Sequence, residues 1–241
     1  MNKLSNPLSV DIAALNINSF ESMEQATTFI LANGEVRNEF AVAINAEKIV
    51  SALEHKNVMK VLKSASLRYA DGITIVWAMN NKGANGVRIP GCDLWTSLML
   101  RSVEYKTPVY IVGASPQVND KVATKLGGLG VNLIGSQNGY FKDEEKVFTE
   151  IARLKPKIVS VAMGSPRQEL FIQKCRKLYP DAFYMGVGGT YDVFVGKVLR
   201  APVWMQKLHL EWSYRLLKQP SRIFRQSNLF KFMWLFLRNK L

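Results

Sequence analysis

Short apolar runs alternate with longer amphipathic stretches over most of this 241-residue sequence, and this alternation limits the fold more than any other feature. The apolar runs are rich in β-branched residues, as strands covered on both faces tend to be. They predict strands at Phe40–Asn45, Val109–Gly113, Asn132–Gly135, Ile158–Met163 and Phe183–Val187. The stretches between them have helical spacing and predict helices at Ala46–Leu67, Gln117–Leu126, Glu144–Leu154 and Gln168–Leu178. The alternation is typical of an α/β fold, in which a parallel sheet is flanked by helices.

Length and composition indicate one Rossmann-like α/β body with a smaller appendage. We expect the body over residues 1–195 and a helical appendage over residues 196–241. Cys92 and Cys175 share no motif, which favours a reducing compartment and excludes a cysteine-built zinc site. The first residues lack the pattern of a signal peptide, and no stretch reaches the roughly 20 apolar residues of a spanning helix. We therefore expect the protein in the cytoplasm or on the cytoplasmic face of a membrane.

Three junctions after predicted strands contain residues suited to binding a phosphate. They are Gly113 with Ser115 and Pro116, Gly164 with Ser165 and Pro166, and Gly188 with Gly189. In the first two, the serine can cap the next helix and the proline can take its first turn. Free N–H groups at helix starts attract anions, and glycine lets a ligand approach the backbone closely. Ser-Pro is also simply a good helix start, so the junctions favour a phosphate-bearing ligand without identifying it.

Five polar side chains lie where they could act on a ligand, and each has a plainer explanation. Asp71 comes after a predicted helix and could be a general base, or it could form an Asp-Gly turn with Gly72. Asn45 ends a predicted strand and could face a ligand or cap the following helix. Arg88 could hold a phosphate with its planar guanidinium, or it could be a solvated loop charge. Gln168 and Glu169 occupy a first helical turn, where Glu169 is ordinarily favourable and nothing more.

Several familiar motifs are missing from the sequence. There is no Asp-x-Asp pair, on which many nucleotide-sugar enzymes hold a divalent metal. There is no phosphate-binding loop of the G-x-x-x-x-G-K-[ST] type, so ATP hydrolysis has no support. We expect neither a metal nor a cofactor, and arginines and helix N-termini would then stabilise an anionic leaving group.

The C-terminal segment carries most of the excess charge. The net charge is +13, and from Lys197 onward ten basic residues face a single acid, Glu211. Three of the five tryptophans lie there as well, and the stretch Leu229–Leu237 is strongly apolar but too short to span a bilayer. Basic residues together with tryptophan and phenylalanine on a short helix are typical of a segment in the membrane interface. We expect this appendage to bind an anionic membrane surface, where each Lys or Arg contributes about 1 kcal/mol.

Seven strings identify the chain as similar to a known family. They are Val42–Glu47, Tyr69–Gly72, Gly135–Phe141, Met163–Glu169, Gly186–Asp192, Lys197–Pro202 and Leu210–Leu217. Together they resemble the WecG/TagA/CpsF glycosyltransferases, and the match is collinear from about residue 40 to about residue 225. Val42–Lys48 and Tyr184–Phe194 resemble most the branch that transfers N-acetyl-D-mannosaminuronic acid in enterobacterial common antigen synthesis.

The resemblance implies an inverting, metal-independent hexosyltransferase. Its donor would be a UDP-sugar and its acceptor an undecaprenyl-diphosphate-linked N-acetylglucosamine at the cytoplasmic face of the inner membrane. Asp71 matches the proposed base of the family, and three further positions match residues that line its pocket: Asn45, Arg88 and Gln168. In the family the C-terminal appendage closes over the active site, with arginines near diphosphate. Arg215, Arg222 and Arg225 follow one another at helical steps and would take that role here.

Other functions stay open at this point. N-acetylmannosamine and glucuronic acid are alternative donor sugars, and no residue distinguishes them. A pI near 9.8 also fits a nucleic-acid-binding protein, although the tail aromatics form an apolar block rather than alternating with charge. A catalytically silent membrane-surface protein that binds a UDP-sugar is a third possibility. The oligomeric state cannot be predicted from these residues.

Overall fold

The computed structural model describes residues 6–208, 211–218, 223–238 and 240–241. Its main element is an eight-stranded sheet with the order β1-β2-β6-β5-β10-β9-β7-β8. These strands are β1 (Ser9–Ile12), β2 (Leu15–Asn18), β5 (Phe40–Ile44), β6 (Leu67–Ala70), β7 (Val109–Gly113), β8 (Leu133–Gln137), β9 (Ile158–Ala162) and β10 (Phe183–Gly186). A short hairpin of β3 (Leu31–Ala32) and β4 (Glu35–Val36) stands apart.

All neighbouring strands of the large sheet run parallel except β1, which pairs antiparallel with β2 at one edge. The central register sets Phe40 of β5 opposite Tyr184 of β10, and Ile158 of β9 opposite Phe183 of β10. The sequence prediction of a parallel sheet flanked by helices is therefore confirmed, and each of the five predicted strands is present to within two residues.

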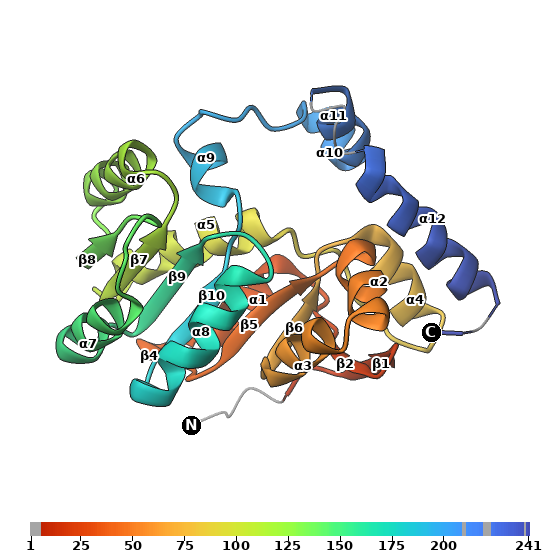
Figure 1. Cartoon of the computed structure of the whole chain (residues 1–241), viewed down its shortest axis with the longest axis horizontal. Coiled ribbons are helices and arrows are strands. Elements are labelled where there is room, and N and C mark those ends of the chain that lie inside the picture. Colours follow the sequence, from red (N-terminus) through yellow and green to blue (C-terminus); the bar gives the residue numbers. More distant parts are fainter. Residues whose placement is uncertain (1–5, 209–210, 219–222, 239) are drawn as a thin grey trace.

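Helices cover both faces of this sheet (Figure 1). Those before the C-terminal segment are α1 (Met23–Ile30), α2 (Ala46–Glu54), α3 (Lys56–Ser64), α4 (Ile73–Asn80), α5 (Gly91–Glu104), α6 (Pro116–Gly128), α7 (Glu144–Leu154), α8 (Arg167–Leu178) and α9 (Thr190–Phe194). Alternate strand residues point to opposite faces and therefore enter separate cores. Val42 and Ile44 belong to the core that includes buried residues of α2, α7 and α8, whereas Ala41 belongs to the core that includes buried residues of α1, α5 and α9.

The expected helix over Ala46–Leu67 is wrong at its C-terminal end. The chain forms α2 and α3 with a break at His55, and Leu67 already begins β6. Leu67 and Tyr69 are buried on one face of the sheet and Ala70 on the other, which is a strand pattern of only four residues. Apolar positions in so short a run fit helical and strand spacing equally well, so the helix prediction continued into the strand.

The described residues of the C-terminal segment form α10 (Val203–Lys207), α11 (Glu211–Lys218) and α12 (Ile223–Leu237). They lie at one end of the molecule, shown in blue in Figure 1, and α12 packs against α2. Phe232 of α12 is fully buried and belongs to the same core as α2 and α8. Among the described residues, no helix has both the length and the apolar character needed to cross a membrane.

Candidate active site

Asn45, Asp71, Gln168 and the site glycines follow four neighbouring strands at one edge of the sheet, where the strands have their carboxyl ends. Because parallel strands end at the same edge, the residues after β6, β5, β10 and β9 come together there. After β5 the chain enters α2, which packs on one face, and after β10 it enters α9, which packs on the other. Open α/β sheets bind ligands at such a point, where neighbouring connections leave in opposite directions.

Asn45 holds the start of α2. Its Oδ1 accepts a hydrogen bond from the backbone N–H of Lys48 at 2.9 Å, so Asn45 is the N-cap that the sequence allowed. The backbone N–H groups of Asp71 and Gly72 both donate to the carbonyl of Ile44, at 2.9 Å and 3.3 Å. A Cβ placed on Gly72 would lie 3.3 Å from the Cβ of Asn45, so glycine lets the two loops touch.

Asp71 follows strand β6, and the expectation that it follows a helix is wrong because Leu67–Ala70 pairs with β5. Its Oδ1 accepts a hydrogen bond from the backbone N–H of Gly91 at 3.3 Å. The side chain keeps 29% of its surface exposed, so it is not closed off from solvent. Asp71 is thus oriented by its neighbours and open to a ligand.

Arg88 binds the Asp71 segment. Its Nε donates to the backbone oxygen of Asp71 at 2.6 Å, and its Nη2 lies 3.8 Å from Asp71 Oδ1. The same Nη2 donates to Oε2 of Glu211 at 3.0 Å. Only 17% of the side chain is exposed, so Arg88 is not the solvated loop charge that the sequence also allowed.

Three charged residues that sequence reasoning left without a role extend this contact. Oε1 of Glu211 accepts from Nε of Arg200 at 3.0 Å, and Arg200 binds the carboxylate of Asp93 with both Nη atoms. Asp93 lies in the first turn of α5. The hydrogen bonds to Asp93 are the main cause of a raised pKa of Arg200. Burial lowers this pKa, and the hydrogen bond to Glu211 raises it further. A single network of charges therefore runs from Asp71 through Arg88 to α11 and α5.

Gln168 connects the ends of β10 and α2. Its Oε1 accepts from the backbone N–H of Gly188 at 2.9 Å, and its Nε2 donates to Oε1 of Glu169 at 3.1 Å. That same oxygen of Glu169 accepts from Nζ of Lys48 at 2.8 Å. A Cβ on Gly186 would lie 2.6 Å from Gln168 Nε2, so glycine is needed at this position for the Gln168 side chain to lie against the backbone.

Glu169 is more than a favourable first-turn residue, and that expectation is corrected. Its side chain is 1% exposed and forms an ion pair with Lys48 of α2. Burial raises the pKa of the Glu169 carboxyl, but the Lys48 ammonium together with hydrogen bonds from Gln168 and Ser165 holds that pKa below its ordinary value. The charged pair fixes α8 to α2 across the carboxyl ends of the strands.

The two Ser-Pro junctions differ from their prediction. Pro116 does begin α6, but the side chain of Ser115 forms no capping hydrogen bond. At the other junction the Ser165–Pro166 peptide is cis, and Pro166 rather than Ser165 occupies the N-cap position of α8. The backbone N–H of Gln168 donates to the carbonyl of Gly164 at 2.9 Å, so the turn closes on Gly164.

The sequence profile of the Glycosyl transferase WecG/TagA/CpsF family matches residues 10–241. The chain belongs to this family. A WecG/TagA/CpsF protein is a glycosyltransferase of cell-surface polysaccharide synthesis, so the charged edge described above lies in an enzyme that transfers a sugar.

The three arginines predicted to bind diphosphate in this WecG/TagA/CpsF protein lie in the C-terminal helices. Arg215 belongs to α11 and Arg225 to α12, and for these two the structure describes the backbone only. Arg222 lies outside the described residues. Their role stays a prediction.

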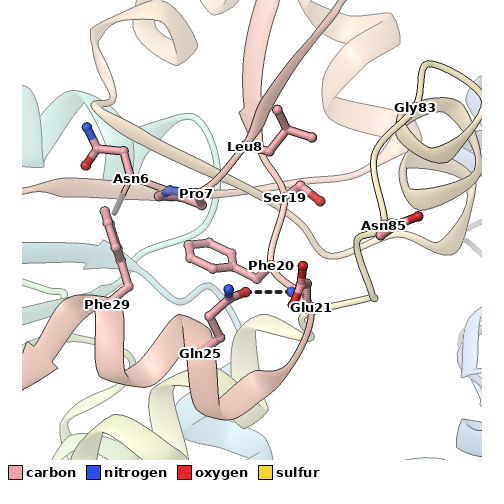
Figure 2. A pocket seen from close by; sticks show the side chains of 10 residues that line it. All are labelled: Asn6, Pro7, Leu8, Ser19, Phe20, Glu21, Gln25, Phe29, Gly83 and Asn85. Atoms are coloured by element: carbon pink, nitrogen blue, oxygen red, sulfur yellow. Dashed lines mark hydrogen bonds between the residues drawn. The ribbon is translucent and has the colours of Figure 1, made fainter. Parts of the chain in front are cut away.

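A hollow of about 280 Å³ lies apart from the charged edge of this glycosyltransferase (Figure 2). Its lining comes from the N-terminal residues, α1 and the loop after α4: Asn6, Pro7, Leu8, Ser19, Phe20, Glu21, Gln25, Phe29, Gly83 and Asn85. Inside it, Gln25 Oε1 accepts from the backbone N–H of Glu21 at 2.7 Å. None of the predicted site residues lines it. Among the described residues, no three His, Cys, Asp or Glu side chains group as metal ligands would.

Proposed function

We propose that this protein is an inverting hexosyltransferase that needs no metal and uses a UDP-sugar as donor. N-acetyl-D-mannosaminuronic acid is the proposed sugar, and undecaprenyl-diphosphate-linked N-acetylglucosamine is the proposed acceptor, in enterobacterial common antigen synthesis. The observation that carries the proposal is the partly exposed Asp71 carboxylate, held beside Arg88 where four parallel strands end. Membership of a glycosyltransferase family supports the reaction class. The likeness of Val42–Lys48 and Tyr184–Phe194 to one branch supports the choice of sugar.

In the proposed reaction Asp71 removes a proton from the 4-hydroxyl of the acceptor. The oxygen attacks the anomeric carbon of the donor as the bond to UDP breaks on the opposite face, so the configuration inverts. A positioned general base contributes on the order of 10²–10⁴-fold to such a step. The proton ends on Asp71, and the negative charge leaves with UDP. Arg88 then stabilises the departing diphosphate with its planar guanidinium.

The glycine loops support a diphosphate position beside Arg88. A Cβ placed on Gly164, Gly188 or Gly189 would meet no described atom within 4 Å, so these backbones face open space. The backbone N–H groups of these loops and the hydroxyl of Ser165 would approach the phosphates there, with Gln168 holding Gly188 in place. Asn45 uses its carbonyl oxygen as a cap and would turn its amide group toward the sugar. Arg215, Arg222 and Arg225 would close over the diphosphate from the appendage.

A panel of donors tests this proposal. The full chain is incubated with a synthetic lipid-diphosphate N-acetylglucosamine and one UDP-sugar at a time: N-acetylmannosaminuronic acid, N-acetylmannosamine, glucuronic acid or N-acetylglucosamine. We expect UDP-N-acetylmannosaminuronic acid to give a disaccharide with inverted anomeric configuration, which mass spectrometry and NMR would identify. Transfer of another sugar from the panel would correct the donor. UDP release without a disaccharide would contradict the acceptor, and no reaction with any donor would contradict the function.

We further propose that residues 196–241 are an appendage that holds the enzyme on the cytoplasmic face of the inner membrane. Helix α12 has two apolar stripes. The inner stripe packs on the body through Leu229, Phe232, Met233 and Phe236. The outer stripe of Phe230, Trp234 and Leu237 is 73%, 48% and 76% exposed. Arg238 and Lys240 lie over the Trp234 ring at 4.4 Å and 5.7 Å, so cations flank the outer stripe as they do in interfacial helices.

Replacing Phe230 and Leu237 together by serine is expected to weaken binding to anionic vesicles about tenfold or more. Burying an apolar side chain of this size contributes about 1.5–3 kcal/mol, and both side chains are exposed in the free protein. Vesicle co-sedimentation with phosphatidylglycerol measures the effect. Leu129 and Leu178, which are also exposed but lie on the body, provide the matched double serine control. Equal binding by both double variants would contradict the outer stripe as the membrane face.

A further inference from the structure

We propose that Glu211, the first residue of α11, is a positioning residue that holds Arg88 on the main chain of Asp71, so that the appendage completes the active site. The inference rests on the roles proposed above for Asp71 and Arg88. It assigns a catalytic consequence to the one acidic residue among the ten basic ones of the C-terminal segment.

The Glu211 carboxylate lies between two arginines. Oε2 accepts from Arg88 Nη2 at 3.0 Å and Oε1 accepts from Arg200 Nε at 3.0 Å, and the side chain is only 5% exposed. Arg200 also binds Asp93, and one of these hydrogen bonds runs from Arg200 Nη2 to Asp93 Oδ2 at 2.9 Å. Asp93 lies two residues after Gly91, whose N–H binds the Asp71 carboxylate. The network therefore starts and ends at the Asp71 segment.

The two distances from Arg88 Nη2 show what Glu211 does. This nitrogen lies 3.0 Å from Glu211 Oε2 and 3.8 Å from Asp71 Oδ1. Without the Glu211 carboxylate, Asp71 becomes the nearest anionic acceptor, and the guanidinium is drawn onto it. With its guanidinium on the Asp71 carboxylate, Arg88 would shield Asp71 from an acceptor hydroxyl. It would also no longer lie where it could bind the diphosphate. Glu211 thus keeps the proposed base and the proposed diphosphate ligand apart.

A second ion pair joins the appendage to the body without touching this site. Lys231 of α12 binds Glu54 of α2, with side chains that are 46% and 40% exposed. Exposed pairs of this kind contribute little to stability. Glu54→Gln is therefore a matched control for Glu211→Gln, since both variants remove one carboxylate that holds the appendage.

The test is a double-mutant cycle between Glu211 and Arg88 in the full chain. Turnover is measured with a soluble short-chain acceptor analogue, and UDP binding is measured separately by titration calorimetry. We expect Glu211→Gln to lower kcat and weaken UDP binding about tenfold each when Arg88 is present, a typical coupling for residues in one network. In an Arg88→Ala background the same change should alter either quantity by about twofold at most. Glu54→Gln should change neither.

Equal losses with and without Arg88 would overturn the inference, because Glu211 would then act only on the docking of the appendage. Unchanged kcat and UDP binding in Glu211→Gln would overturn it as well. If the glutamine variant does not fold, Glu211→Asp keeps the charge, shortens its reach and enters the same cycle. The UDP-binding arm needs no turnover, so it decides the inference even if the donor panel shows no transfer and the proposed function fails.

Discussion

Asp71→Asn is expected to lower sugar transfer by about 10²–10⁴-fold, which is the contribution of a general base. The variant should keep its fold, since asparagine retains an Oδ1 that can accept from the Gly91 N–H and a side chain of the same shape. UDP-sugar binding should stay within about threefold, because the donor would be held by Arg88 and the glycine loops. The measurements are kcat with the lipid-linked acceptor, donor affinity by calorimetry and the melting midpoint.

Asp181→Asn is the matched control for this loss. Asp181 is exposed just before β10, at the opposite edge of the sheet, so its variant should transfer sugar at the wild-type rate. Near-normal turnover in Asp71→Asn would remove Asp71 from the mechanism. A loss of donor binding as large as the loss of turnover would instead make Asp71 a binding residue.

The sheet was predictable because its central strands are buried on both faces. Val109–Gly113 and Ile158–Ala162 are buried at every position, so each is a continuous apolar run that no amphipathic helix would produce. The edge strand β1 and its neighbour β2 are half-buried and four residues long, and β6 is equally short. A run of four residues is too short to show a clear strand or helix periodicity in its apolar positions, so pairing with a strand distant in sequence decides its structure.

The candidate site divides in the same way. Asn45 and Gln168 follow strands that the sequence indicated, but Asp71 follows β6, where the sequence indicated no strand. The charged partners could not be found by spacing, because their contacts join residues far apart in the chain. Lys48 and Glu169 are separated by 121 residues, and Arg88 and Glu211 by 123. Lys48, Glu169 and Glu211 lie in or next to strings shared with the family, whereas Arg88 matches a pocket position of the family outside those strings.

The appendage shows how charge composition can mislead about a single residue. Its ten basic residues predict a surface for anions, and against them the lone Glu211 looks like a minor correction to the net charge. In the structure Glu211 is buried and pairs with Arg88 of the body and Arg200 of the segment before α10. The acid and the bases would therefore have separate tasks: the acid would fix the appendage to the site, and the bases other than Arg200 would serve the proposed membrane and diphosphate contacts.

Arg88→Ala is expected to lower kcat/KM by about 10²–10³-fold, comparable to the loss of one donor that stabilises a developing negative charge. Three contacts disappear together: the one to the Asp71 carbonyl, the one to its carboxylate and the one to Glu211. UDP binding should weaken as well, unlike in Asp71→Asn, because the diphosphate loses a cation. The Arg153→Ala variant, which removes an exposed arginine of α7, should match the wild type in both assays.

Arg88→Lys separates charge from geometry at this position. A lysine keeps the positive charge but has no planar fork, so it cannot donate to the Asp71 carbonyl and to Glu211 at once. We expect this variant to regain much of the UDP affinity that alanine loses while its kcat stays low, since the Asp71 loop is no longer held. Recovery of both quantities would mean that Arg88 acts as a point charge and that the loop is positioned by other contacts. No recovery of UDP affinity would place the diphosphate away from Arg88, toward the glycine loops and the appendage arginines.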